Sequence, residues 1–121
     1  MKTILVVEDM NSQQLLISRL LKNYGFEVIP HDSAETAWTW LTTNTKPNLI
    51  LLDIIMPGQS GLDLCRVIRK EEKFNQVPIV FCSSKNQESD RFWALRQGGN
   101  AYITKPFSPV ELIDVVYQHV N

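Results

Sequence analysis

The sequence contains little cysteine, little glycine and no long apolar segment. Two cysteines, Cys65 and Cys82, are too few for a disulfide framework, so we expect buried, reduced thiols and a cytoplasmic protein. The longest apolar runs, such as Ile4–Val7, contain four residues. A membrane span needs about 20. The amino terminus also lacks an apolar segment followed by a small-residue cleavage site. These absences predict a protein that neither enters a membrane nor is exported.

An excess of basic residues is also missing. Twelve Lys and Arg against 13 Asp and Glu leave a net charge of −1, so the chain does not carry the charge typical of nucleic-acid binding or of an anionic membrane surface. Five glycines and six prolines among 121 residues exclude collagen-like and Pro/Gly-rich disordered chains. The 44% of hydrophobic residues suffices for the core of one globular domain, which we expect to span residues 1–121.

Short apolar runs alternate with longer segments of helical spacing along the whole chain. This alternation is typical of an α/β fold with a parallel sheet, and a strand that is apolar at every position is buried on both faces. We expect a doubly wound, five-stranded parallel sheet of order 2-1-3-4-5 with five helices. The expected strands are Thr3–Val7, Phe26–Ile29, Asn48–Asp53, Pro78–Cys82 and Ala101–Thr104.

Capping residues and glycines predict where the helices begin and end. In the first helix, Leu15, Leu16 and Leu20 recur at helical spacing, and in the third we expect Leu64, Val67 and Ile68 to face the core. The five helices are expected from an Asn11 or Ser12 cap to Tyr24, from Ser33 to Leu41 or Thr42, from Ser60 to Lys70 or Lys73, from the polar stretch Ser83–Asp90 to near Gln97, and from Ser108 to about Val120.

Acidic residues follow two strands that this order makes neighbours. Glu8 and Asp9 come after the first strand, and Asp53 closes the third. Because the carboxyl ends of parallel strands meet at one edge of a sheet, the three carboxylates are expected to converge. Crowded carboxylates repel one another, and a hard divalent cation with oxygen ligands relieves this repulsion. We therefore predict a Mg²⁺ site with Asp9, Asp53 and one backbone carbonyl as direct ligands and Glu8 acting mainly through water.

Ser83 follows the fourth strand and Lys105 the fifth, at the same edge of the sheet. Taken singly, such a serine is usually a turn or cap residue and such a lysine a solvated charge. Their joint placement with the three acids indicates a site for a phosphoryl group instead. A hydroxyl can donate to one phosphoryl oxygen and an ammonium can pair with another, while Asp53 attacks phosphorus and forms an acyl phosphate.

Four sequence segments carry a resemblance to a known family. They are Val6-Val7-Glu8-Asp9, Leu51-Leu52-Asp53-Ile54-Ile55-Met56-Pro57-Gly58 with Gly61 beyond, Phe81-Cys82-Ser83-Ser84, and Thr104-Lys105-Pro106-Phe107. Together, and in this order along the whole chain, they resemble the receiver domain of bacterial two-component response regulators. The resemblance implies a signalling switch rather than an enzyme, one that accepts phosphate on Asp53 from a histidine kinase.

The same resemblance implies roles for further residues. Glu8 and Asp9 would be the acidic metal pair, Ile55 would supply a backbone carbonyl to the metal, and Ser83 would be the switch hydroxyl. Tyr102 matches the family's switch aromatic, which turns inward on activation, although a half-buried strand tyrosine would fit the same position. Lys105-Pro106 matches a cis peptide bond of the family. The residues two positions after Asp53 and Ser83, Ile55 and Lys85, occupy places where the family tunes the lifetime of the phosphate.

The region from the fourth helix onward indicates a more specific relationship. Ser84–Trp93, with Arg96-Gln97-Gly98 beyond, resembles the CheY-type regulators of pilus-based twitching and phototaxis systems. The output surface is expected on helix 4, strand 5 and helix 5, with Arg91, Trp93 and Tyr102 contacting an effector such as a motility motor or pilus component. Phe92 and Trp93 could instead be core residues.

Three alternatives remain beside a stand-alone regulator. The chain could be the excised receiver domain of a longer regulator with a DNA-binding or enzymatic output. A flavodoxin-type FMN protein is disfavoured because Glu8 and Asp9 would repel the cofactor's phosphate. A phosphatase that forms an aspartyl phosphate typically has a second Asp two residues after its nucleophile, where this chain has Ile55.

Overall fold

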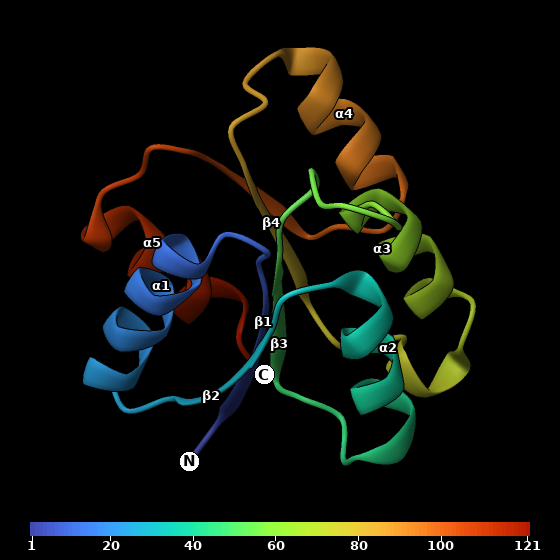
Figure 1. Ribbon diagram of the computed structural model, residues 1–121, viewed down its shortest axis with the longest axis horizontal. Helices are drawn as coiled ribbons and strands as arrows, with labels where there is room; N and C mark the ends of the chain where they lie inside the picture. The colour runs from blue at the N-terminus through green and yellow to red at the C-terminus, as the bar shows by residue number, and fades with distance from the viewer.

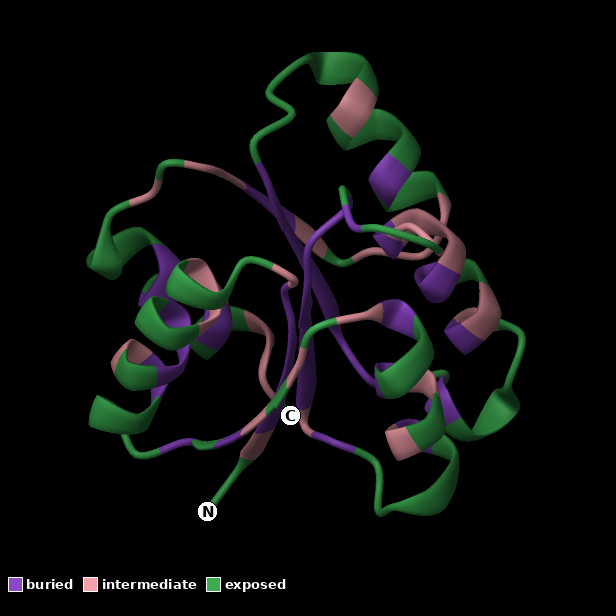
Figure 2. Cartoon of the chain, viewed as in Figure 1, coloured by how far each residue is buried: buried purple, intermediate pink, exposed green.

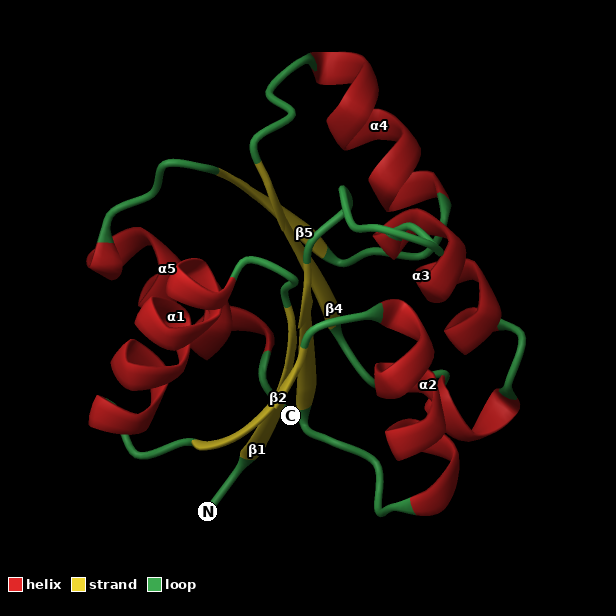
Figure 3. Ribbon diagram, viewed as in Figure 1, coloured by secondary structure: helices red, strands yellow, loops and turns green.

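A parallel β-sheet forms the centre of the protein. The computed structural model describes all residues from 1 to 121. Its five strands lie in the order β2-β1-β3-β4-β5, so the predicted order is confirmed (Figures 1 and 3). The strands are β1 (Thr3–Val7), β2 (Glu27–His31), β3 (Leu49–Leu52), β4 (Ile79–Ser83) and β5 (Ala101–Thr104). All are parallel, so their carboxyl ends share one edge.

Helices cover both faces of the sheet. Helices α1 and α5 lie on one face, and α2, α3 and α4 lie on the other (Figure 1). Alternate residues of β1 pack into the two cores, Leu5 and Val7 on the α2–α3 side and Ile4 and Val6 on the α1–α5 side. The continuous apolar runs thus reflect strands that are buried on both faces. The helices are α1 (Asn11–Asn23), α2 (Ala34–Thr43), α3 (Gly61–Arg69), α4 (Glu88–Arg96) and α5 (Pro109–His119), with a short 3₁₀ helix η1 (Glu72–Phe74) after α3.

The ends of β2, β3 and β4 differ from the sequence prediction by one or two residues, and β4 runs from Ile79 to Ser83 instead of from Pro78 to Cys82. β2 extends to His31 through Pro30, which the sequence placed outside the strand. β2 is an edge strand paired only with β1, and a proline is tolerated there because its missing N–H is not needed by a second neighbour. β3 ends at Leu52, so Asp53 is the first residue beyond the strand, although its N–H still donates to the Val7 carbonyl at 3.0 Å.

Helix α1 differs most from its prediction. It begins at Asn11 with Met10 at the N-cap position and no side-chain cap, so the expected Asn11 or Ser12 cap is wrong. Its buried face holds Ile17, Ser18 and Leu21, whereas Leu15 and Leu16 are 50% and 57% exposed. The leucines are therefore available to a partner rather than to the core.

Helices α3 and α4 are both short. α3 ends at Arg69, before either predicted end, and Cys65 rather than the half-buried Val67 completes its core face. α4 begins only at Glu88, after a capping box between Gln87 and Asp90. Ala94 is its one buried residue, and Figure 2 shows a mostly exposed helix. No helix has the length and apolar character needed to cross a lipid bilayer.

Candidate functional site

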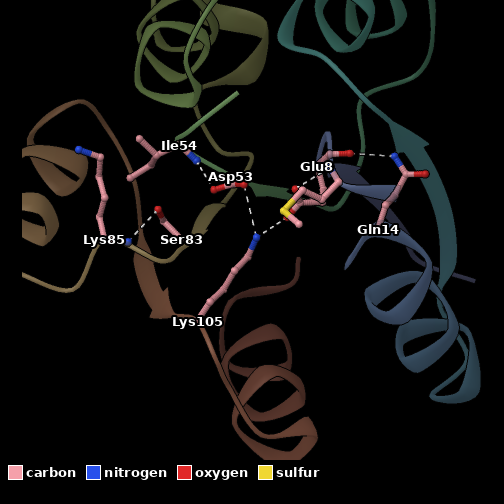
Figure 4. Close-up of polar contacts among 8 residues, drawn as sticks. Glu8, Gln14, Asp53, Ile54, Ser83, Lys85 and Lys105 are labelled. Atoms are coloured by element: carbon pink, nitrogen blue, oxygen red, sulfur yellow. Dashed lines mark hydrogen bonds and ion pairs between the residues drawn. The ribbon is translucent and has the colours of Figure 1, made fainter. Parts of the chain in front are cut away.

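The predicted acidic and basic side chains meet at the carboxyl edge of the sheet. Val7 of β1 pairs with Leu52 of β3, so the residues that follow, Glu8 and Asp53, are neighbours. Carboxylate oxygens of Glu8, Asp9 and Asp53 all lie within 4.8 Å of one another. Lys105, just after β5, extends its ammonium between Glu8 and Asp53 (Figure 4). The structure thus brings these four predicted residues into one site.

Glu8 is only 2% exposed, and three hydrogen bonds hold it in place. Its Oε1 accepts a hydrogen bond from Lys105 Nζ, and its Oε2 accepts one from the Met10 N–H at 3.1 Å. The Gln14 side chain donates to the Glu8 carbonyl at 3.0 Å (Figure 4). The first two hydrogen bonds give both buried carboxylate oxygens a donor, and the third holds the backbone of Glu8.

Asp53 is fixed by its own neighbours in the chain. Its Oδ1 accepts from the Ile54 N–H at 2.7 Å, and its Oδ2 lies 3.4 Å from Lys105 Nζ. The start of α3 packs directly against it, because a Cβ added at Gly61 would lie 1.9 Å from the Asp53 carbonyl oxygen. Only glycine fits at position 61. The carboxylate is 8% exposed, so it is buried by protein yet borders an open cavity.

Lys105 is the one cation among the three carboxylates. Burial alone would lower its pKa, but the hydrogen bond to Glu8 and the charge of Asp53 outweigh burial and raise the pKa above its usual value. Its backbone N–H donates to the Ser83 carbonyl at 2.8 Å, and the Lys105–Pro106 peptide bond is cis, as the sequence predicted. Lys105 is therefore charged and pointed into the site at neutral pH.

The acidic group fits a divalent metal ion by its chemistry. One lysine cannot balance three carboxylates, and Mg²⁺ binds hard oxygen ligands of this kind while keeping several waters. A cavity of about 490 Å³ opens onto Asp9, Asp53, Ile55 and Lys105, which leaves room for water and for phosphoryl oxygens. The role of the Ile55 carbonyl remains a prediction, while its side chain is 52% exposed at the cavity wall.

Ser83 and Tyr102 lie beside this group and are linked through Lys85. Ser83 is fully buried, and its Oγ accepts from the Lys85 N–H at 3.3 Å (Figure 4). The Tyr102 hydroxyl donates to the Lys85 carbonyl at 2.8 Å. Tyr102 is buried rather than half-buried, and this burial raises the pKa of its phenol. The loop after β4 is thus tied both to Ser83 and to Tyr102, the two predicted switch residues.

The two residues of α4 predicted to contact a partner lie in different surroundings. The Arg91 guanidinium stands 5.4 Å from the centroid of the Tyr102 ring, so it covers part of this buried side chain. Trp93 instead lines a separate cavity of about 440 Å³ with residues of the loop after β3, among them Met56. Phe92 and Trp93 are 53% and 54% exposed, so the alternative that they belong to the core is wrong.

Sequence reasoning missed the groups that orient Glu8. The Met10 N–H and the Gln14 side chain act through contacts that no residue-type pattern indicates, because any residue offers a backbone N–H and Gln14 occupies an ordinary helix position. Gly61 was noted in a motif, but only the structure shows the close approach that requires it.

Comparisons with known proteins are consistent with this geometry. The family model described as "Response regulator receiver domain" matches residues 4–117. The phosphate regulon transcriptional regulatory protein PhoB of Pseudomonas aeruginosa is 37% identical over 112 residues, which cover 93% of this chain but 48% of PhoB. The chain thus spans about half the length of this relative. Protein PilH of the same species is 29% identical over 116 residues, which cover 96% of this chain and 95% of PilH.

A solved structure has the same fold. The chemotaxis protein CheY4 of Vibrio cholerae superimposes with a TM-score of 0.93, at 21% identity and with 99% of each chain covered. At this identity the likeness concerns the fold alone, and it confirms the expected CheY-like arrangement.

Proposed function

The chain belongs to the response regulator receiver domain family, and from this premise we propose that it is a switch that accepts a phosphoryl group on Asp53 from a histidine kinase. The receiver domain in this proposal comprises residues 1–121. The observation that carries the proposal is the meeting of Asp53 with Glu8, Asp9 and Lys105 beside an open cavity. A buried aspartate with only a structural role would not need two further carboxylates and a lysine around it.

Asp53 is placed to act as a nucleophile. Its Oδ1 is held by the Ile54 N–H, which fixes the plane of the carboxylate. In the transfer, a carboxylate oxygen forms a bond to phosphorus while the P–N bond of phosphohistidine breaks. The electron pair of that bond goes to the imidazole nitrogen, which is protonated as it leaves. The product is an acyl phosphate on Asp53.

Lys105 and Ser83 then bind the new group. The Lys105 ammonium, already 3.4 Å from Asp53 Oδ2, pairs with one phosphoryl oxygen, and the Ser83 hydroxyl turns to donate to another. Since the Ser83 oxygen accepts from the Lys85 N–H and the Lys85 carbonyl accepts from Tyr102, a change at Ser83 reaches Tyr102 through two hydrogen bonds. Phosphorylation thereby shifts a pre-existing equilibrium on the α4–β5–α5 face.

Mg²⁺ belongs to this proposal as the cofactor. Asp9, Asp53 and the Ile55 carbonyl would hold it directly, with Glu8 through water. When bound, it supplies positive charge that offsets the carboxylates and the phosphoryl oxygens.

An apolar rim around the cavity supports docking of the kinase. Met10 and Leu16 are 56% and 57% exposed, and both line the cavity with Pro106 and Phe107. An exposed apolar rim next to a charged centre suits a partner helix that delivers its phosphohistidine to Asp53. We therefore assign these exposed apolar residues of α1 to docking of the kinase, because packing within the protein does not account for them.

We propose that the effector binds the face carrying Arg91 and Tyr102, with Trp93 beside it, and that the protein is a stand-alone cytoplasmic regulator of pilus-based motility or taxis. Coverage of 95% of PilH supports the stand-alone form. The higher identity to PhoB, of which the chain spans 48%, favours the second candidate, a receiver domain from a longer regulator. The full-length transcript decides between the two candidates. Deletion of the gene tests the motility assignment, which unchanged surface motility and taxis would contradict.

The phosphoacceptor chemistry is tested with purified protein and acetyl phosphate, followed by intact mass. We expect a gain of one phosphoryl group that requires Mg²⁺ and is absent in Asp53→Asn. Asp63→Asn, which removes a half-exposed carboxylate of α3 that pairs with Arg66, serves as the matched control and keeps the gain. A wild-type mass unchanged by acetyl phosphate and by phosphoramidate would overturn the proposal.

A further inference from the structure

The loop between β3 and α3, residues 54–60, carries the proposed metal carbonyl but has few hydrogen bonds of its own. The Ile54 carbonyl accepts from the Gly61 N–H at 2.9 Å, which closes the two ends of the loop. Among the backbone N–H groups from Ile55 to Ser60, only that of Gln59 has a partner. The position of the loop between these points therefore depends on very few contacts.

That partner is a carboxylate from a different element. Glu35 Oε2 accepts from the Gln59 N–H at 3.0 Å. The same oxygen lies against Gly58, where an added Cβ would stand 2.9 Å from it. Gly58 has a φ of +77°, a conformation that glycine adopts without strain. The loop thus turns around the Glu35 carboxylate, which touches two of its residues.

Glu35 has a rigid base from which to hold the loop. It lies in the first turn of α2, where Ser33 caps the helix by accepting from the Thr36 N–H at 3.1 Å. The flanking Ala34 and Ala37 are fully buried, so this turn is fixed against the core. The side chain itself is exposed and lies outside the group of Glu8, Asp9 and Asp53 that could hold a metal ion. Its contact is therefore with the loop and not with the metal site.

We infer that Glu35 is a positioning residue for the metal site, one that acts by holding the loop that carries Ile55. This inference rests on the proposed function, because it assigns Glu35 a role toward the Mg²⁺ that Asp9, Asp53 and the Ile55 carbonyl would bind. Groups that orient metal ligands contribute to affinity without touching the ion. The buried side chains of Ile54 and Met56 also hold the loop, so loss of Glu35 loosens the loop without unfolding it.

The test is a calorimetric titration of the metal-free protein with Mg²⁺. Glu35→Ala is expected to bind Mg²⁺ about three- to tenfold more weakly than the wild type, the effect of one hydrogen bond of ordinary strength. Glu35→Gln keeps an oxygen that can accept from the Gln59 N–H, so we expect its affinity within about twofold of the wild type. Glu72→Ala is the control for net charge. It removes an exposed carboxylate from η1, which precedes the amino end of β4, whereas the metal site lies at the carboxyl end of the sheet.

A second readout separates positioning from general damage. The rate of phosphorylation by acetyl phosphate is measured against Mg²⁺ concentration, and Glu35→Ala should need more Mg²⁺ for half its maximal rate while reaching nearly the same maximum. Wild-type affinity in Glu35→Ala, or equal losses in Glu35→Ala and Glu35→Gln, would overturn the inference. A wild-type protein that binds no Mg²⁺ would overturn the proposed function as well, and the two failures differ in the behaviour of the wild type.

Discussion

Single contacts at the carboxyl edge of the sheet set the geometry of the site. At Gly61 the backbone approaches Asp53 so closely that no side chain fits. A methyl group there would lie 1.9 Å from the Asp53 carbonyl oxygen, so either α3 or the loop after β3 has to move. We expect Gly61→Ala to lower the free energy of unfolding by about 3 kcal/mol, in the upper range of overpacking costs. Urea unfolding measures the change.

Gly25 offers a matched control at the end of α1. It has a φ of +89° and no atom within 4 Å of an added Cβ, so Gly25→Ala should cost only about 1 kcal/mol, for the left-handed backbone. Gly61→Ala should also slow phosphorylation of Asp53, whereas Gly25→Ala should not. Equal losses of stability in the two variants would contradict the close approach at Gly61.

Lys105 predicts a dependence of stability on alkaline pH. Its pKa in the folded protein is raised by Glu8 and Asp53 against the opposing effect of burial. The folded state therefore holds this proton more tightly than the unfolded state. The stabilisation is complete below the pKa of an unfolded lysine, about 10.4, and is lost as the pH rises through the higher pKa of the folded protein.

This loss is measured by urea unfolding between about pH 9 and pH 12, a range that spans the unfolded and the raised folded pKa of the lysine. The wild type should lose stability relative to Lys105→Met over this range, whereas Lys46→Met, at an exposed lysine, should follow the wild type. Burial raises the pKa of the Cys65 thiol to about 11, and this contribution cancels because the difference between variants is compared. Burial also raises the pKa of Cys82, to about 12, but the charge of Lys105 acts on this thiol, so its titration belongs to the measured difference. Parallel curves for wild type and Lys105→Met would refute the ion pair.

At the scale of elements, α4 is mostly exposed to solvent, whereas α5 packs one face into the core. α4 buries only Ala94, whereas α5 buries Leu112, Ile113 and Val116. Trp93→Ala should therefore lower the free energy of unfolding by less than about 1 kcal/mol, and Leu112→Ala should lower it by about 2–5 kcal/mol. Chemical denaturation compares the two. A larger loss from Trp93→Ala would mean that α4 is a packed helix and not an exposed surface.

The sequence predicted the elements well where one strong pattern decided them. Uninterrupted apolar runs indicated the strands, and their ends located Glu8, Asp53, Ser83 and Lys105. It failed at the start of α1, where Met10 and not Asn11 or Ser12 is the N-cap residue. The helical spacing of Leu15 and Leu16 also does not reveal that both are exposed. Tertiary contacts across 24 residues, such as Glu35 with Gln59, leave no sequence pattern at all.

At the scale of the whole molecule, the three carboxylates make folding and metal binding interdependent. Glu8, Asp9 and Asp53 converge only in the folded chain, so Mg²⁺ should bind the native state and stabilise it. At a concentration 100 times the dissociation constant, the gain is about 2.7 kcal/mol. Thermal unfolding at increasing MgCl₂ measures the gain, which should be smaller in Asp53→Asn. A rise in Tm reproduced by NaCl of equal ionic strength would contradict a specific site.

The central claim is that Asp53 becomes an acyl phosphate, and reduction with borohydride tests it most directly. Borohydride converts an aspartyl phosphate into homoserine, which peptide mass mapping locates. After treatment with acetyl phosphate and Mg²⁺, we predict homoserine at position 53, and none when Mg²⁺ is withheld. Homoserine at Asp9 or at another aspartate, with Asp53 unmodified, would contradict the account.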